Sequence, residues 1–450
     1  MIPPDELAAI RYGMGLPATG PSDPAGLVAA LTGPDTMLAT YPGPTGAEAV
    51  VFKARFVKIN TDARKINDAA SIKARQDIRH ERRAEQFASA RRTLARAVDA
   101  PVGFRERLAR FWTDHFTVVA KSGYGAMLPS AFVDEAIRPH LTARFADMLR
   151  ASTLHPAMLD YLDQAQSVGP NSRLGRKRAR GLNENLAREV IELHTLGVAA
   201  TYAQTDVRQM AELLTGLSLS DDGFVFRRDQ AEPGSETVLG VTYDGVGLDP
   251  VNAVLEDIGT RPDTGQHIAR KLAVHFVSDS PDDGMVLGMA QAFGDTGGDL
   301  PSVYRAMLDH PAAWGPALAK ARQPFDLIVA GFRALGLDGA RVSDIRDRVF
   351  RRTVMDPMAA MGQPWQAPRG PDGWPEAPEA WITPQLLAAR VTWGMEAPAL
   401  LIRDLPEPAS VVVRALGSAP DERVVWAAAR AETRAEGLGV IFASPMFNRR

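Results

Sequence analysis

The sequence predicts a mainly α-helical protein, built as one large helical domain over residues 1–450 around a single core. Apolar residues recur at helical period through most of the chain, which is the pattern of helices with one buried face. Hydrophobic residues make up 45% and charged residues 23% of the chain, a composition typical of globular proteins with a large core. Two segments lose the helical period, and we expect a small inserted β-hairpin and a long irregular loop there.

The helical pattern gives the expected helices in chain order. It begins with a highly charged stretch at 62–99 and resumes at intervals as far as residue 443. The further expected helices are 103–117, 129–149, 154–164, 183–197, 204–215, 263–277, 299–309, 322–335, 339–352, 383–394, 421–431 and 434–443.

The inserted β-hairpin is expected at about 217–245, where the helical period disappears. Segments 223–227 and 237–243 resemble two strands, because they are rich in aromatic and β-branched residues and flank a turn at 231–235. We therefore expect these two segments to pair with each other.

The irregular loop is expected at about 356–380. It is rich in proline and glycine and contains Trp365 and Trp374. Indole rings favour burial, so we expect this loop to be packed against the protein. Long ordered loops in compact proteins are often functional.

The charge and cysteine content narrow the function. A formal net charge of -3 suggests no nucleic-acid partner, and the absence of cysteine excludes disulfides and thiolate chemistry.

No apolar run approaches the ~18 residues of a membrane span. The N-terminal residues lack the pattern of a secretory leader. We expect no membrane span and a cytoplasmic location for the sequence as written, or a periplasmic or exported one if a leader was removed.

Several well-defined catalytic motifs are absent from the sequence. It contains no glycine-rich dinucleotide or phosphate loop, no nucleophile elbow and no helical zinc-protease motif. The paired Glu-x-x-His signature of four-helix carboxylate proteins is also missing. These absences argue against dinucleotide-binding, kinase-like, α/β-hydrolase, zinc-protease and ferritin-like proteins.

The densest polar segment is the expected helix at 183–197. At about 100° per residue its polar side chains occupy one sector, and the spacing predicts ion pairs of Arg188 with Glu184 and with Glu192. Gly197 is placed for a left-handed helix cap. The sequence favours a solvated, self-paired face, and the alternative is a buried carboxylate cluster suited to acid–base chemistry. In that alternative the active groups are Glu184, Arg188, Glu189 and Glu192, with Asn183 and Asn185 contacting substrate.

A second constellation lies at 110–116. His115 shares a helix face with Leu108 and Phe111, while Arg110 and Asp114 share another. An imidazole among aromatic rings is usually a hydrogen-bonded core residue, and the alternative is a catalytic base beside a substrate-binding Asp114.

Three histidines lie on apolar helix faces and raise a metal hypothesis. If their helices converge, His115, His194 and His275 form the ligands of one divalent metal ion. The alternative, which the sequence favours, is that each is a core histidine.

Two segments are rich in Lys and Arg, at 79–92 and 173–180. A solvated surface is the ordinary explanation, and contact with an anionic substrate or an acidic partner is the alternative. The segments lack interleaved aromatic residues, which argues against a nucleic-acid role.

The ordered set of these blocks resembles one bacterial family, the domain of unknown function eighteen-hundred. The resemblance covers essentially the whole chain. It is carried by the blocks 111–118, 155–163, 181–198, 205–216, 268–277, 361–364, 373–375, 381 and 443–447.

The resemblance implies an uncharacterised activity, with members that are often exported and often encoded beside a sulfatase-like family, which suggests such a partner protein. Two departures stand out. This sequence lacks the leader of many members, and residues 228–236 lack the His and Lys that the family commonly carries in the hairpin. The second departure leaves open whether this member kept the family's activity.

Two hypotheses follow. The first is a hydrolase-like enzyme that uses acid–base or metal-assisted chemistry on a saccharide-type or anionic substrate, with the loop residues Gln363, Trp374 and Trp381 lining the cleft. The second is a non-catalytic helical binding or assembly protein that acts with a partner enzyme. A solvent-open cleft shared by Glu184, Glu189 and His115 would favour the enzyme, and separate local partners would favour the binding protein. If Glu189 is half of a buried pair, Glu189→Ala should cost about 2 kcal/mol or more.

Overall fold

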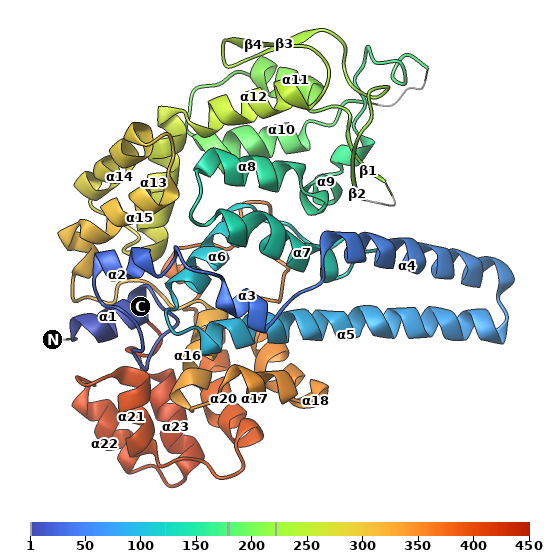
Figure 1. The fold of residues 1–450 in the computed structure, drawn as a ribbon. Coiled ribbons are helices and arrows are strands. Elements are labelled where there is room, and N and C mark those ends of the chain that lie inside the picture. The colour runs from blue at the N-terminus through green and yellow to red at the C-terminus, as the bar shows by residue number, and fades with distance from the viewer. Residues whose placement is uncertain (1, 122, 178–180, 221–222) are drawn as a thin grey trace.

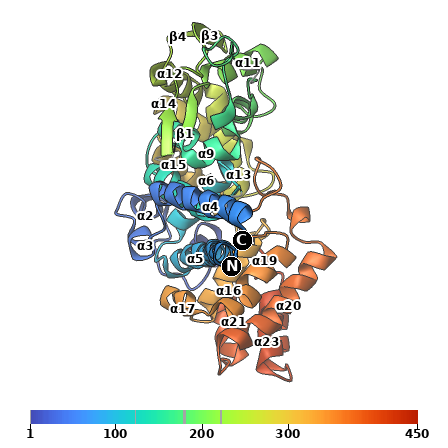
Figure 2. The same ribbon diagram turned by 90° about the vertical axis from the view of Figure 1, so that its right-hand side faces the viewer.

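The computed structural model describes residues 2–121, 123–177, 181–220 and 223–450. Helices dominate this part of the chain and its only sheets are two small two-stranded ones, so the predicted mainly helical fold is confirmed. The buried apolar side chains form two clusters, whereas a single core was expected. We call the bodies around them the upper lobe and the lower lobe, after their places in Figures 1 and 2. That the two lobes form one domain stays a prediction.

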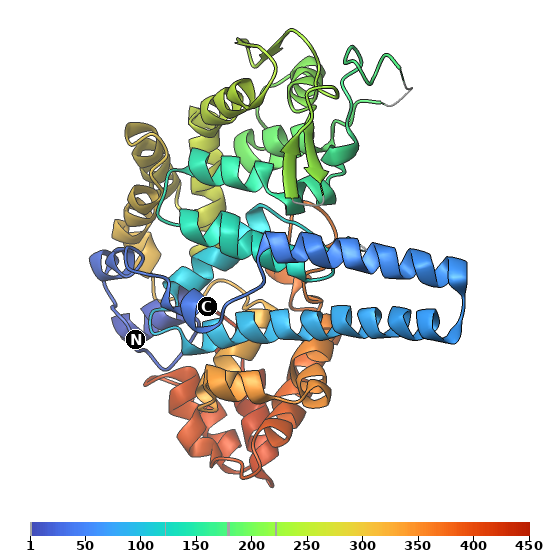
Figure 3. The same ribbon diagram turned by 45° about the vertical axis from the view of Figure 1, so that its right-hand side comes forward.

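The N-terminal part of the chain contains three short helices and a long helical hairpin. Its helices are α1 (Pro4–Arg11), α2 (Pro24–Ala29), α3 (Thr36–Thr40), α4 (Gly46–Ile66) and α5 (Ala69–Asp99). We call α4 and α5 the arm, because they run side by side and project from the body of the molecule in Figures 1 and 3.

The arm replaces the single helix expected at 62–99. The chain reverses at Asn67, which has the left-handed φ of 54°, and the Asp68 side chain caps α5 by accepting a hydrogen bond from the backbone N–H of Ser71. Asn and Asp are favoured in these positions because their short polar side chains satisfy local backbone groups. The helical period runs through both helices, so periodicity alone did not locate the break.

The upper lobe is built mainly from helices. They are α6 (Phe104–His115), α7 (Met127–Phe132), η1 (Val133–Ile137), η2 (Arg138–His140), α8 (Phe145–Leu154), α9 (Pro156–Tyr161), η3 (Gln164–Gln166), α10 (Asn185–Glu189), η4 (Val190–Leu196), α11 (Gln204–Leu213), α12 (Leu248–Gly259), α13 (Pro262–Phe276), α14 (Asp283–Asp295), α15 (Leu300–Asp309) and η5 (Pro311–Trp314). The sequence missed α12 and α14, and in α14 three glycines interrupt the apolar pattern.

The polar helix expected at 183–197 is α10 followed by the π-helix η4. Within η4 the Thr195 hydroxyl donates to the carbonyl of Val190, five residues back, at 2.6 Å. Gly197 has a φ of 84° and a ψ of 152°, so it is not the left-handed cap that we expected. Short π-helical turns are often found at functional sites.

The β segment consists of two hairpins, not one. Strand β1 (Leu217–Ser220) pairs with β2 (Gly223–Phe226), and β3 (Ser235–Val238) pairs with β4 (Val241–Asp244), both antiparallel. The position of the expected hairpin is confirmed, but its two strands, β2 and the β3–β4 segment, do not pair with each other. Each strand instead pairs with the strand next to it in the chain. This is favoured because closing a short loop costs less conformational entropy than closing a long one. Residues 221–222 of the expected hairpin lie outside the described residues.

The lower lobe contains the C-terminal helices and the irregular loop. Its helices are α16 (Pro324–Ala334), α17 (Gly339–Asp344), α18 (Asp347–Phe350), η6 (Arg351–Met355), α19 (Asp356–Ala360), η7 (Pro378–Ala380), α20 (Pro384–Leu401), α21 (Pro408–Leu416), α22 (Glu422–Ala429) and α23 (Arg434–Ala443). The loop expected from residue 356 begins after α19, because 356–360 are helical. We call residues 361–383 the strap.

No helix among the described residues is long and apolar enough to cross a membrane. The basic segment 173–180 is described as far as Lys177 and forms turns beside the β2–β3 connection. Residues 178–180 of that segment lie outside the described residues.

Candidate functional site

A cavity of about 130 Å³ lies where the arm base, the upper lobe and the strap meet. Helix α6 of the upper lobe contributes Asp114 to its lining, α13 contributes His275, and α16 of the lower lobe contributes Asp326. The strap contributes Trp365 and Trp374. Two indole rings therefore share one cavity with the imidazole of His275 and with the carboxyl groups of Asp114 and Asp326.

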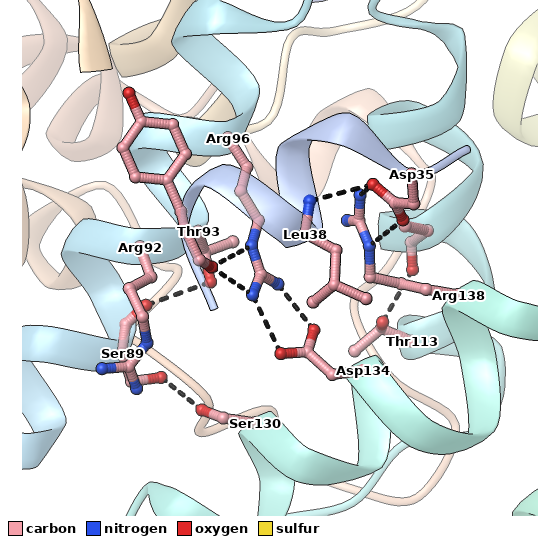
Figure 4. Close-up of polar contacts among 12 residues, drawn as sticks. Asp35, Leu38, Ser89, Arg92, Thr93, Arg96, Thr113, Ser130, Asp134 and Arg138 are labelled. Atoms are coloured by element: carbon pink, nitrogen blue, oxygen red, sulfur yellow. Dashed lines mark hydrogen bonds and ion pairs between the residues drawn. The ribbon is translucent and has the colours of Figure 1, made fainter. Parts of the chain in front are cut away.

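One wall of the cavity is formed by arginines that are paired with carboxylates (Figure 4). Arg96 of α5 makes two hydrogen bonds to Asp134, at 2.6 and 2.9 Å. Arg138 donates to Asp35 and also to Glu106, at distances between 2.7 and 2.9 Å. The positive charges of this wall are therefore largely balanced by neighbouring carboxylates.

Asp114 is held by the strap. Its Oδ1 accepts a hydrogen bond from the backbone N–H of Trp374 at 2.9 Å. Gly373 allows this approach, because it has a φ of 80° and a Cβ there would lie 2.7 Å from the Asp114 carboxyl. Burial raises the pKa of Asp114 to about 7, and the charge of Glu376 adds to the increase. Asp114 was predicted as a substrate contact, and the structure brings it into the cavity.

His275 belongs to a series of interacting polar side chains that connects the upper lobe to the lower lobe. Its Nδ1 lies 2.5 Å from Glu376 Oε1, and its Nε2 lies 3.2 Å from Arg107. Because Arg107 can only donate, Nε2 is the acceptor and Nδ1–H donates to Glu376. Arg107 also pairs with Asp326, and Glu376 pairs with Lys320 at 3.0 Å.

Two of the lining carboxyl groups, Asp114 and Asp326, differ in ionisation. Burial alone would raise the pKa of Asp326, but Arg107 and Arg110 lower it below the ordinary value. Asp326 Oδ1 makes no hydrogen bond to the described residues, although Arg110 Nε lies at 3.3 Å. One carboxyl, Asp114, is thus partly protonated near neutral pH while the other carries its charge.

Glu376 is the third carboxyl of this region. Burial would raise its pKa, but His275 and Lys320 lower it to about 2. Its charge and those of Asp114 and Asp372 act on Lys271 of α13, whose pKa is lowered by burial.

His115 and His194 form a separate, sealed cluster. The ring centroids lie 6.0 Å apart, and His115 Nε2 lies 3.1 Å from the backbone carbonyl of His194. Burial lowers the pKa of His115 and brings that of His194 to about 3. Phe111 and Phe116 pack against His115. Both histidines are therefore neutral core residues at ordinary pH.

The proposed metal triad does not assemble. His275 is turned to Glu376 and Arg107, whereas His115 and His194 pack on each other. Among the described residues no three His, Asp or Glu side chains are grouped as metal ligands.

The polar helix has its predicted ion pairs, at 3.5 Å from Arg188 to Glu184 and at 2.8 Å from Arg188 to Glu192. Glu189 differs from these three. It is half-buried with no ion pair in the described chain, and burial together with the charges of Glu192 and Asp372 raises its pKa to about 7. The structure brings Glu189 toward the strap, but not into one cleft with Glu184 and His115.

The remaining predicted substrate contacts have local partners. Buried Gln363 lines the cavity, accepts from the N–H of Phe325 at 2.8 Å and donates to Gln323 at 3.0 Å. Trp381 is 1% exposed and supports Trp374 from outside the cavity lining, with ring centroids 6.1 Å apart.

The two asparagines of the polar segment stabilise the start of α10. The Asn183 amide donates to the carbonyl of Leu162 at 2.8 Å, and its Oδ1 accepts from the N–H of Asn185 at 3.0 Å. Neither lines the cavity.

The family comparison covers nearly the whole chain. The model described as "Protein of unknown function (DUF1800)" matches residues 21–449. The chain belongs to the DUF1800 family. No curated protein and no solved structure matches it. The family description therefore names no reaction for this DUF1800 chain.

The sequence missed several of the residues that line or support the cavity in this DUF1800 protein. Asp326, Glu376 and Lys320 carry no local motif, and their partners lie 41 to 219 residues away in the chain. Two signals of the site were present in the sequence. One was the helix face that Asp114 shares with Arg110, and the other was the pair of tryptophans in the strap.

Proposed function

We propose that this protein is a hydrolase-type enzyme that acts on a neutral saccharide in the cavity between the lobes. The supporting observation is that two carboxyl groups with opposite pKa shifts line one cavity together with two tryptophans. A pair of carboxyl groups whose pKa values are pushed apart is the usual arrangement for an acid and a base that work together.

Asp114 is the proposed general acid. A carboxyl group with a pKa of about 7 is partly protonated at neutral pH and can give its proton to a leaving oxygen. The ionised Asp326 is the proposed base, because its Oδ1 makes no hydrogen bond within the described residues and can accept a proton from water. Its partner Arg107 holds the carboxylate in place.

A neutral saccharide suits the cavity better than an anion. Arg96, Arg107 and Arg138 are each already paired with a carboxylate, so they offer little net positive charge to an anionic ligand. Indole faces pack well against the C–H faces of sugar rings. The buried N–H of Trp365 makes no hydrogen bond to the described residues and can donate to a hydroxyl.

The test is a hydrolysis screen with a binding readout. Purified protein is incubated with a panel of neutral oligosaccharides, and the release of reducing ends is compared between wild type, Asp114→Asn and the matched surface control Asp309→Asn. We expect Asp114→Asn to lower the rate by about 100-fold or more and the control to change little. Tryptophan fluorescence reports binding, because Trp365 and Trp374 line the cavity.

Two results would overturn the enzyme proposal. One is cleavage that Asp114→Asn does not reduce. The other is a panel in which no sugar is cleaved although some change the fluorescence. The second result would favour a non-catalytic binding protein, a role consistent with the local partners of His115 and Glu184. In that role the family resemblance suggests a sulfatase-like partner, which co-purification with that protein would test.

A further inference from the structure

The arm extends beyond both lobes (Figures 1 and 3). Its two helices pack through a narrow apolar seam in which Ala63 and Ile78 are buried. Its base is fixed to the body by the ion pairs of Arg96 with Asp134 and of Arg91 with Asp347. The arm therefore has a defined direction, while its outer half presents most of its surface to solvent.

The arm carries an excess of positive charge. Residues 46–99 contain 13 Lys and Arg against 7 Asp and Glu, a net charge of +6, in a chain whose total is -3. The rest of the chain therefore carries -9. Three carboxylates of the arm are already used in internal pairs, Glu81 with Arg55, Asp77 with Lys73 and Glu85 with Arg92.

Several arm cations have no ion pair among the described residues. They are exposed and belong to both helices: Lys58, Arg64, Lys65, Arg79 and Arg83. Apolar side chains are exposed beside them, with Val57 50%, Ile66 62% and Ile72 43% exposed. Exposed apolar residues set among unpaired charges of one sign are typical of a surface that binds a partner of the opposite sign.

The side of the molecule away from the arm carries an excess of negative charge. Residues 262–309, which contain α13 to α15, have 7 Asp and Glu against 3 Lys and Arg, a net charge of -4. Helices α13, α14 and α15 of this segment lie on the side of the body away from the arm (Figure 1). On α14, Asp283 and Asp295 are exposed, and Leu287 between them is 61% exposed.

We propose that the arm of one molecule docks onto the α13–α15 surface of a second copy of this chain. The two surfaces differ in sign and each combines charge with exposed apolar groups. Pairing of two arms is disfavoured, because both carry the same charge. Association of two unlike surfaces is head-to-tail, so it produces rings or open chains rather than a closed two-fold dimer. This inference is independent of the proposed enzymatic function.

The test measures the mass of the full chain in solution by sedimentation velocity. We expect self-association in low salt that weakens by about tenfold or more near 0.5 M salt, because such charges are screened. The double variant Lys58→Glu/Lys65→Glu should abolish it. A matched control, Arg403→Glu/Arg423→Glu, makes the same change of charge on the lower lobe and should leave a larger fraction associated.

A charge swap makes the test specific. The variant Asp283→Lys/Asp295→Lys should also fail to self-associate, and mixing it with the Lys58→Glu/Lys65→Glu variant should restore assembly. Circular dichroism checks that each variant is folded. The proposal is overturned if the wild type is monomeric at every salt concentration, if the arm and control variants behave alike, or if the mixture stays monomeric.

Discussion

Asp114 and His115 are neighbours in the sequence, yet they belong to two very different buried regions. Asp114 faces the cavity, where its pKa is raised to about 7 and its carboxyl contacts the strap. His115 faces the core, where aromatic rings surround it and its pKa is lowered. Both groups lose charge on burial, but only Asp114 keeps access to a ligand. The comparison shows that a shifted pKa alone does not distinguish a group beside a cavity from a group sealed in the core.

The largest expected effect on stability is at Asp326, the ionised carboxylate of the cavity, and it is compared with His115 in the sealed cluster. Asp326→Ala would remove the carboxylate that forms ion pairs with Arg107 and Arg110, so we expect a loss of about 3–5 kcal/mol in the free energy of unfolding. His115→Leu is the matched change in the sealed cluster, and we expect about 1–2 kcal/mol, because it removes one hydrogen bond of a neutral group. Urea denaturation measures both. Equal losses would contradict the contrast between the two regions.

A smaller effect concerns pH. The pKa of Asp114 rises from an ordinary 3.8 to about 7 on folding. Between these two pH values the folded protein therefore keeps a proton on Asp114 that the unfolded chain has released. Stability should therefore fall as the pH rises through this window. Asp114→Asn should reduce this decline, as followed by thermal melting at a series of pH values. A decline that is the same in the variant would assign it to other groups, of which Glu189 is the first candidate.

The smallest effect is expected at Glu189. Glu189 has no buried ion pair among the described residues, so its removal should cost little stability. The charges of Glu192 and Asp372 also oppose its ionisation. We therefore expect Glu189→Gln to change stability by less than about 0.5 kcal/mol at neutral pH. Glu184→Gln is the control that removes an ion pair on the same helix. A loss near 2 kcal/mol at Glu189 would show that it has a stabilising partner.

The sequence predicted what depends on local pattern. Periodicity located α6, α13 and the polar helix, and composition located the strap. It could not locate the break at Asn67 or the π-helical turn at 190–196, because both preserve a helical distribution of apolar residues.

The candidate site was predicted only in part for a related reason. Asp114, Gln363 and Trp374 were named because they lie in polar or aromatic blocks. Asp326 and Glu376 acquire their roles from partners on other elements, such as Arg107 and His275, and no spacing in the sequence encodes those contacts.

Under the proposed function, the contact between Asp114 and the strap would couple the protonation of Asp114 to how firmly the strap is held. Asp114 accepts the N–H of Trp374, and a carboxylate accepts a hydrogen bond more strongly than a neutral acid does. If Asp114 gives up its proton during a turnover, the strap is held more firmly at that moment and loosens when the proton returns. Under the proposed function, the escape of product from this cavity would then keep pace with reprotonation of a single carboxyl group.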